Sequence, residues 1–495
     1  MEYLWVLRRL RNSPVPKRHH STSMEVHMTA HARILRSLWL AAIASMALSG
    51  LPRLAMADQT GPNVILVVID ALRPDHLGAW GHVQARTPNL DRVASQGVFF
   101  RNIFAPMPSS SPSRASILTG RAPHTHGVRI NGRTLPGEER TLAEIFRDAG
   151  YVTVSVGQVS DGREQGFEYI NIARGMGGAD SLARRMWDVN ARTQASLRSA
   201  RPETSRAVTG AITWLRSHRN DQRPAFIWLD MPENVHEAWR PPAPYSTMYD
   251  SGYTGRDVSV NTMYSPALTE REVRHARALY DGQLTYVDKQ LGPLFDEIER
   301  LGLAENTVLV VMSDHGTFMG EHALWQKPPI MLDGLMRSTL IVRYRPAVPA
   351  GVQTEHLAQL SDVFATVLDL AGQPIPEQVS GASYSLRPLW EQNRPVRDAV
   401  YMEFCSYKGT AAKAIRTPKW LYIYTRSVGT IPWGEGISPA QVFQALGWPP
   451  HLLFDLEADP GLSRNVVQEH PEVETQLRFK LLDWLIDSED DVPRN

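Results

Sequence analysis

Acidic residues follow two short apolar runs that have the composition of buried strands. Asp70 comes directly after Asn63–Ile69, and Asp314 with His315 follows Thr307–Met312. Either aspartate alone could simply cap a turn. Because ligands of open α/β sheets bind beyond the carboxyl ends of the strands, two acids at equivalent strand ends predict a cation site. Carboxylate oxygens suit calcium, magnesium or manganese, whereas the histidine favours manganese or zinc.

A serine-rich segment at 109–121, with the sequence SSSPSRASILTGR, supplies a third chemical element. Pro112 suits the first turn of a helix, because its missing N–H group is not needed there. A serine just before it would lie at the helix N-terminus, where free N–H groups and the helix dipole favour an anionic group. Arg114 would add a positive charge at the same point. The alternative is a flexible, cap-rich loop, and the length and order of the segment argue against it.

The elements that would position these residues alternate along the chain. Further apolar runs at 151–156 and 225–229 predict two more buried strands. A capping box predicts a helix at 141–149, and apolar residues at helical spacing predict a long amphipathic helix at 279–301. This alternation predicts an α/β fold with a mostly parallel sheet flanked by helices.

The chain of 495 residues exceeds the length at which one hydrophobic core usually stops growing, which predicts a large domain and a smaller one. We place the large, catalytic domain at 58–390. Strands expected at 400–404 and 420–424 and a final helix at 472–486 predict a small α+β domain at 391–495. Lys plus Arg and Asp plus Glu both total 52, so bulk charge favours neither nucleic acid nor an acidic membrane surface as a partner.

Residues 1–57 have the pattern of an upstream segment followed by a secretory signal peptide. Arg33 and Arg36 precede an apolar stretch at 38–48, and small residues at 55–57 offer a cleavage site. The apolar stretch is shorter than the roughly 20 residues that span a bilayer. We therefore predict an exported protein, periplasmic or secreted, with no membrane span in the mature chain. An uncleaved membrane anchor is the alternative.

The chain has one cysteine, Cys405, which excludes an intramolecular disulfide. A lone cysteine could act as a nucleophile, but no histidine-rich motif surrounds this one. Because it follows the apolar run at 400–404, we expect a buried structural thiol.

The segment at 110–121 resembles the signature of the sulfatase family, within the alkaline-phosphatase-like superfamily. Other motifs agree in order and spacing, from Pro62 to the end of the chain. They are PN at 62–63 leading to Asp70, TPNLD at 87–91, SDHG at 313–316, GEH at 320–322, and LFDL at 453–456 with Asp459 and Asn465. The stretch at 150–157 is most similar to the iduronate-sulfatase branch.

The resemblance implies a metal-assisted displacement at sulfur. Ser110 takes the place of the residue that is converted to formylglycine, whose hydrate attacks the sulfur atom. Asp70, Asp314 and His315 would hold a divalent cation, commonly calcium with manganese as the alternative. This cation would bind both the nucleophile at Ser110 and a sulfate oxygen.

Three further residues match catalytic positions of the family. Arg114 would orient the nucleophile and offset its charge. His236 would protonate the leaving alcohol, and Lys327 would contact a sulfate oxygen. Without such roles, His236 would be an ordinary loop histidine and Lys327 a solvated charge.

The sequence also departs from the family pattern at three places. Ala71 stands where many relatives have a second metal aspartate, and a site with one carboxylate fewer should hold calcium less tightly. Gln158, Ser160 and Asp161 occupy the stretch where most sulfatases have a lysine and a histidine. Position 110 is serine and not cysteine, so three possibilities remain: conversion by a maturation enzyme, direct attack by the serine as in alkaline phosphatases, or a degenerate relative that only binds.

These features predict hydrolysis of an organic sulfate ester, in a small molecule or a sulfated sugar. Hydrolysis of a phosphonate monoester or phosphodiester by the same residues is the alternative reaction. A non-catalytic protein that binds sulfated sugars is the alternative from another class.

Overall fold

The computed structural model describes most of the chain beyond the predicted signal peptide, within the compact unit Gln59–Asn495. The described residues are 61–157, 159–170, 203–231, 235, 239–258, 268–405, 411–425 and 447–489. The predicted upstream segment and signal peptide, Gln158 and His236 lie outside the described residues. None of the helices in the described ranges is both long and apolar enough to cross a membrane.

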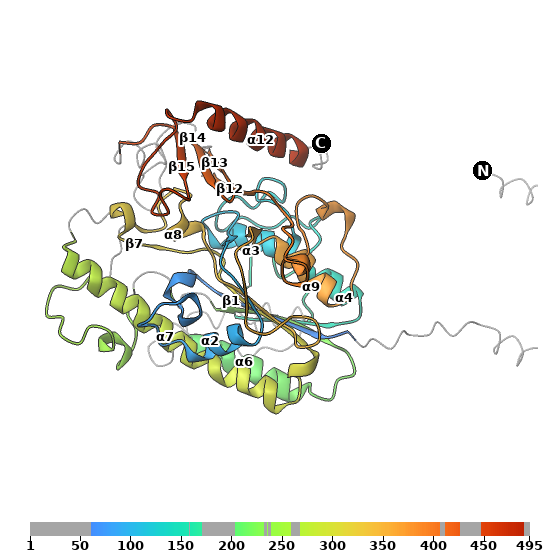
Figure 1. Cartoon of the computed structure of the whole chain (residues 1–495). Helices are drawn as coiled ribbons and strands as arrows, with labels where there is room; N and C mark the ends of the chain where they lie inside the picture. Colours follow the sequence, from blue (N-terminus) through green and yellow to red (C-terminus); the bar gives the residue numbers. More distant parts are fainter. Residues whose placement is uncertain are drawn as a thin grey trace, which may run out of the picture. The chain divides into compact units, whose positions relative to one another are not determined.

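A seven-stranded sheet forms the centre of the described part of the chain (Figure 1). Its strands, in spatial order, are β10 (Val352–Thr354), β2 (Val98–Phe100), β9 (Leu340–Arg343), β6 (Thr307–Met312), β1 (Asn63–Ile69), β5 (Ala225–Met231) and β4 (Val152–Val156). All neighbours pair in parallel except β9, which runs antiparallel to both β6 and β2. The predicted mostly parallel sheet is therefore confirmed.

Both faces of this sheet are covered by helices, which explains why its central strands β1, β5 and β6 are largely apolar and buried along nearly their whole length. Alternate residues of β1 belong to different cores: Val64 and Val68 to one, Ile65 and Ile69 to the other. Residues of α3 (Ser110–Thr119), α4 (Leu142–Asp148) and α9 (Asp362–Leu370) join the first core. Residues of α2 (Pro88–Ser95), α6 (Glu203–Ser217) and α7 (Glu270–Arg300) join the second, so the two sets of helices flank the sheet (Figure 1).

Two capping boxes fix where helices begin. Thr141 and Glu144 form the predicted box at α4. Helix α7 begins at Glu270, nine residues before the apolar pattern that predicted it, because Thr269 and Glu272 form a second capping box. The prediction placed the start of α7 too late, since its first turns carry mostly charged residues and lack the apolar spacing.

Short elements connect the main ones. Two-stranded pairings join β3 (Ile103–Phe104) with β11 (Ala358–Gln359) and β7 (Phe318–Met319) with β8 (Trp325–Gln326). The short α-helices are α8 (Asp333–Met336) and α10 (Arg387–Glu391). The 3-10 helices are η1 (Pro74–His76), η2 (Gly78–Trp80), η4 (Tyr245–Thr247), η5 (Ala304–Asn306), η6 (Glu321–Ala323) and η7 (Glu377–Val379).

A four-stranded antiparallel sheet lies near the C-terminus, as the α+β prediction required. Its strands, in order, are β12 (Val400–Cys405), β13 (Ala411–Arg416), β14 (Trp420–Thr425) and β15 (His451–Asp455), and α12 (Pro471–Glu489) follows. Leu477 and Leu481 of α12 pack with Ile415, Tyr422 and Leu453 of this sheet. Cys405 is only half-buried, so the expectation of a buried thiol was wrong. The residue is the last of β12, whereas the buried residues lie within the strand. The domain boundary near residue 390 stays a prediction.

Candidate active site

Three carboxylates lie at the carboxyl ends of three adjacent parallel strands. Asp70 follows β1, Asp314 follows β6, and Asp230 is the penultimate residue of β5. All three side chains are buried. The sequence predicted two of them. The strand-end argument would also have found Asp230, because it comes directly after the apolar run predicted at 225–229.

Arg114 on α3 joins the three carboxylates. Its guanidinium nitrogens lie 3.3 Å from Asp70, 3.0 Å from Asp230 and 3.0 Å from Asp314. Burial alone would lower the pKa of Arg114, but the surrounding carboxylates raise it well above its usual value. The guanidinium therefore stays charged and offsets part of a concentrated negative charge.

Asp230 has a different electrostatic environment from an exposed aspartate. Burial raises its pKa to about 6, although Arg114 and Arg163 act in the opposite direction. Arg163 is itself buried and donates to the carbonyl oxygen of Ser160 at 3.1 Å. Burial and repulsion from Arg114 lower the pKa of Arg163. A second positive side chain, Arg163, therefore acts on this cluster from a segment where the sequence lacks the family's lysine and histidine, and no sequence pattern predicted its role.

Ser110 is the first residue of α3 and the most exposed residue of that helix. Its Oγ lies 3.3 Å from Asp70 Oδ2, to which it donates, and 3.2 Å from His315 Nε2. Ser113 anchors the helix start, because its hydroxyl donates to the carbonyl oxygen of Asp314 at 2.6 Å. The predicted helix thus begins at Ser110 and presents this hydroxyl at its N-terminus, where the helix dipole favours an anion.

His315 points its Nε2 atom into the cluster. Its Nδ1 donates to the carbonyl oxygen of Gly316 at 2.8 Å, which leaves a lone pair on Nε2. Burial lowers the pKa of His315; the Asp314 carboxylate opposes this shift and the Lys327 ammonium adds to it. The imidazole is therefore held neutral, as a metal ligand must be.

The cluster fits a divalent cation. One ligand atom each from Asp70, Asp314 and His315 lies within 4.8 Å of the others, and all three residues are buried. Carboxylates with one imidazole suit calcium, manganese or zinc. Ala71 is buried, in the left-handed conformation (φ 59°), and its N–H donates to Asp314 Oδ1 at 3.3 Å. This position contributes a backbone contact to the cluster and no carboxylate.

The predicted site residues are thus only partly brought together. Asp70, Ser110, Arg114, Asp314 and His315 form one contacting group. Lys327 follows β8, is buried, and acts electrostatically on His315. His236 falls outside the described residues, so its predicted role stays a prediction.

Gly157, directly after β4, lies close against the backbone of Asp230. It has φ +94°, and a β-carbon placed on it would lie 2.0 Å from the carbonyl oxygen of Asp230. We expect Gly157→Ala to lower the free energy of unfolding by about 2–4 kcal/mol, from left-handed strain together with this clash. Gly132→Ala is the control, since Gly132 has φ +79° and its β-carbon would meet no described atom within 4 Å. Urea unfolding measures both, and equal losses would show that the contact with Asp230 does not matter.

A mostly parallel sheet with a carboxylate and histidine cluster beyond its strand ends places this chain among the alkaline-phosphatase-like hydrolases. Residues 62–373 match the family model described as Sulfatase. The chain belongs to the sulfatase family and is a sulfate ester hydrolase of that family.

The relatives extend over most of the chain. The ulvan-active sulfatase of Formosa agariphila is 27% identical over 432 residues, which cover 83% of this chain and 82% of the relative. The iduronate 2-sulfatase of Mus musculus is 29% identical over 384 residues, which cover 63% and 69%. The structure of the phosphonate monoester hydrolase of Silicibacter pomeroyi superposes with a TM-score of 0.68 at 22% identity, covering 86% of this chain and 96% of that one. This last likeness concerns the fold alone.

Proposed function

We propose that this protein hydrolyses sulfate esters with residue 110 as the nucleophile and a divalent cation, calcium or alternatively manganese, beside it. The observation that carries the proposal is the position of Ser110. Its Oγ is within 3.3 Å of both Asp70 Oδ2 and His315 Nε2, at a helix N-terminus. A hydroxyl in contact with two candidate metal ligands is placed to share their cation.

Asp70, Asp314, His315 and residue 110 would hold the cation, which when bound would favour the ionised nucleophile and offset the charge of the sulfate. Arg114 keeps the carboxylates of Asp70 and Asp314 fixed relative to the helix that carries residue 110. The positive end of the α3 dipole would favour the sulfate oxygens at the same point.

Side chains around the sulfate assist the remaining steps of the reaction. As the nucleophilic oxygen bonds to sulfur, the bond from sulfur to the ester oxygen breaks and its electron pair goes to the leaving alcohol. We propose that His236 donates a proton to this oxygen and that Lys327 offsets charge on a sulfate oxygen. Arg163 offsets part of the negative charge of Asp230.

We propose that a maturation enzyme oxidises Ser110 to formylglycine, and that the two hydrogens removed pass to an electron acceptor of that enzyme. The hydrated aldehyde offers a nucleophilic oxygen and an easy route for expelling sulfate. An unmodified serine would instead be left as a stable sulfate ester. Direct attack by the serine, as in alkaline phosphatases, is the alternative.

We infer that the substrate is a sulfated sugar and that the protein is exported. The substrate inference rests on the names of the two relatives, one active on ulvan and the other named for iduronate. The pattern at 150–157 supports a member of the iduronate-sulfatase type. Export rests on the predicted signal peptide within residues 1–57.

Hydrolysis of phosphonate monoesters or phosphodiesters is the second candidate function. Two observations favour it. The site has one metal-binding carboxylate fewer, because Ala71 adds only a backbone N–H, and neutral or acidic residues occupy 158–161.

The protein should hydrolyse an aryl sulfate faster than a matched aryl phosphodiester or phosphonate ester. Removal of metal with a chelator should lower the sulfatase rate by at least about 100-fold, because the cation offsets charge that develops in the transition state. Added calcium or manganese should restore it. Faster turnover of either phosphorus ester would move the assignment to the second candidate. A sulfatase rate that the chelator leaves unchanged would overturn the metal role.

A further inference from the structure

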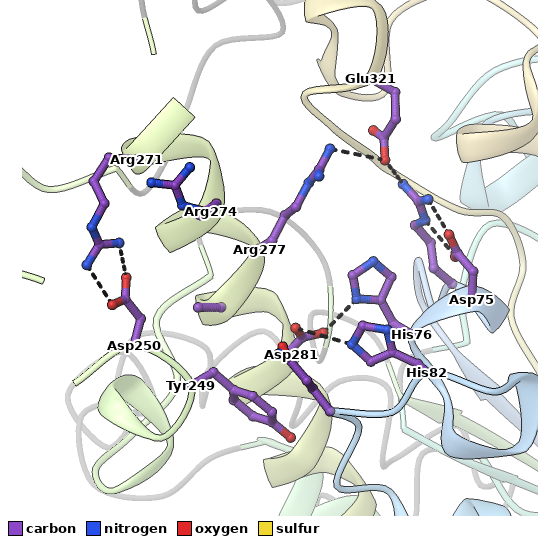
Figure 2. A pocket seen from close by; sticks show the side chains of 13 residues that line it. Asp75, His76, His82, Tyr249, Asp250, Arg271, Arg274, Arg277, Asp281 and Glu321 are labelled. Atoms are coloured by element: carbon purple, nitrogen blue, oxygen red, sulfur yellow. Dashed lines mark hydrogen bonds and ion pairs between the residues drawn. The ribbon is translucent and has the colours of Figure 1, made fainter. Parts of the chain in front are cut away.

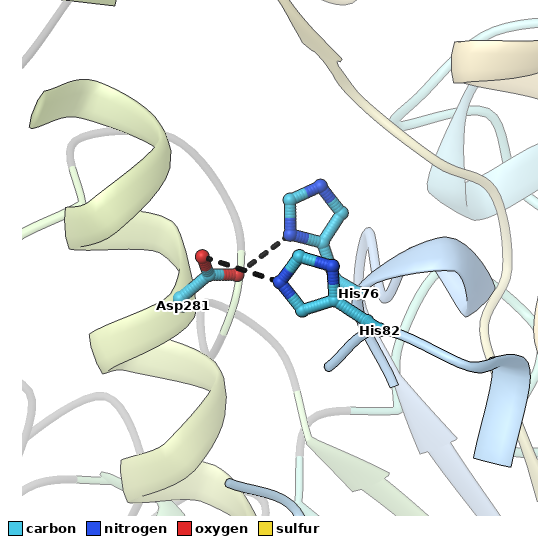
Figure 3. A group of neighbouring side chains, drawn as sticks. All are labelled: His76, His82 and Asp281. Carbon is cyan, nitrogen blue, oxygen red and sulfur yellow. Dashed lines mark hydrogen bonds and ion pairs between the residues drawn. The ribbon is translucent and has the colours of Figure 1, made fainter. Parts of the chain in front are cut away.

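A second cluster of metal-ligating side chains lies outside the site described above. His76 ends η1, His82 follows η2, and Asp281 lies on α7, about 200 residues later in the chain. Both imidazoles turn a nitrogen toward the two oxygens of the same carboxylate (Figure 3). One ligand atom from each residue lies within 4.8 Å of the others.

Hydrogen bonding accounts for only half of this arrangement. His76 Nδ1 lies 2.6 Å from Asp281 Oδ1, an ordinary histidine–aspartate hydrogen bond. His82 Nε2 lies 3.9 Å from Asp281 Oδ2, which is too far for a hydrogen bond. This Nε2 atom is shielded from solvent and has no hydrogen-bond partner among the described residues. An unsatisfied buried polar atom is unfavourable, and its direction toward Asp281 leaves a place for a ligand between them.

We propose that His76, His82 and Asp281 bind a divalent transition metal of the zinc class. Two imidazoles and one carboxylate form the donor set of three-ligand zinc sites. Ligands at about 2.0–2.2 Å in a tetrahedron lie about 3.4 Å from one another. The observed 2.6 Å and 3.9 Å, which run to the two different oxygens of Asp281, lie on either side of that value, and one ligand atom of each residue already lies within 4.8 Å of the others.

The remaining coordination position would face a cavity of about 550 Å³ that all three residues help to line (Figure 2). Its other charged side chains include Arg271, paired with Asp250, and Arg277, close to Glu321. Across the whole lining, four arginines face four carboxylates, so the cavity has no excess positive charge that would oppose a cation. Three protein ligands leave room there for water or a small anion.

Tyr280 connects this cluster to the turn after Asp70. Its ring packs edge-on against His76, with centroids 5.0 Å apart. Its hydroxyl donates to the carbonyl oxygen of Ala71 at 3.1 Å and accepts from the N–H of Arg73 at 2.8 Å. A metal bound to Asp281 would therefore hold η1 against α7. Tyr280, the residue of α7 before Asp281, also holds the turn after Asp70.

Zinc titration of metal-stripped, full-length protein tests the proposal, with excess calcium present to compete for the oxygen-rich site at Asp70 and Asp314. We expect His82→Ala and Asp281→Asn each to bind one zinc ion fewer than the wild type. The affinity loss should exceed the roughly 10–100-fold cost of losing an outer-shell partner. Zinc should also raise the Tm of the wild type more than that of either variant. Unchanged zinc number and affinity in these variants would overturn the proposal.

His470→Ala is the matched control, because His470 is a partly exposed histidine outside the cluster. It should keep the wild-type zinc number. Cobalt added to the wild type in excess calcium gives a test that needs no variant. Strong visible absorption of a four-coordinate site is expected, and its absence would equally overturn the proposal. Neither result depends on sulfatase activity, so the sulfatase proposal stands or falls separately.

Discussion

Ser110→Ala is expected to lower kcat/KM for a sulfate ester by about 10⁴-fold or more, the scale seen when a catalytic nucleophile is removed. The loss should come without unfolding. Ser110 is partly exposed, and in the part of the chain that the structure describes its hydroxyl bonds to Asp70 and His315 alone, so the free energy of unfolding should change by about 1 kcal/mol or less. Steady-state kinetics and urea unfolding of the same preparation measure both quantities.

Ser111→Ala is the matched control, since Ser111 is the next residue of α3. Its backbone N–H donates to Asn131, and the substitution keeps that bond. Its activity should remain within about tenfold of the wild type. The mass of the peptide that contains Ser110 separates the two routes of attack, because formylglycine is lighter by two hydrogens. Efficient sulfatase turnover with an unmodified mass would contradict the formylglycine route, and an active Ser110→Ala would contradict the nucleophile.

Replacing Arg114 by methionine should be the most destabilising single change in the site. It would remove the charge that pairs Asp70, Asp230 and Asp314 while keeping most of the side-chain volume. Removal of one partner from a buried ion pair costs about 3–5 kcal/mol, because the remaining charges are left without compensation. Chemical unfolding in the presence of chelator should show this loss, and added calcium should recover part of it.

An exposed ion pair gives the comparison for Arg114. Arg140 pairs with Asp148 at 2.8 Å, with both side chains about half exposed, so Arg140→Met should cost less than about 1 kcal/mol. A loss at Arg114 no larger than that at Arg140 would mean that the three carboxylates are relieved in some other way, such as protonation of Asp230. The raised pKa of Asp230, about 6, means that this carboxylate takes up a proton as the pH falls through that value.

Local patterns predicted the parts of the site that depend on one element at a time. Asp70 and Asp314 follow strands whose apolar composition identifies them, and the helix at Ser110 has its own proline and serine markers. Strand order was not predictable in the same way. The antiparallel strand β9 has only four residues, and its place between β6 and β2 depends on packing that no local pattern records.

Residues that meet only through the tertiary fold were missed. Arg163 acts on Asp230 from a segment of irregular structure, where the sequence offers no periodicity to position it. His76 and Asp281 are separated by 205 residues, and their pairing follows from η1 lying beside α7. A helical pattern that starts α7 too late still includes Asp281, but it does not say which neighbour that residue faces.

The order of strands in the sheet also affects how fast this chain can fold. The central strand β1 pairs with β5 and β6, whose residues come roughly 160 and 240 positions later in the chain. Such long-range parallel pairing makes folding slow, since the chain must close large loops before the contacts stabilise it. Every residue of α3 after Ser110 is buried once the sheet has formed. If a maturation enzyme reads the 110–121 segment, as we propose, we expect it to act on the newly made chain before folding, while the sheet is still open.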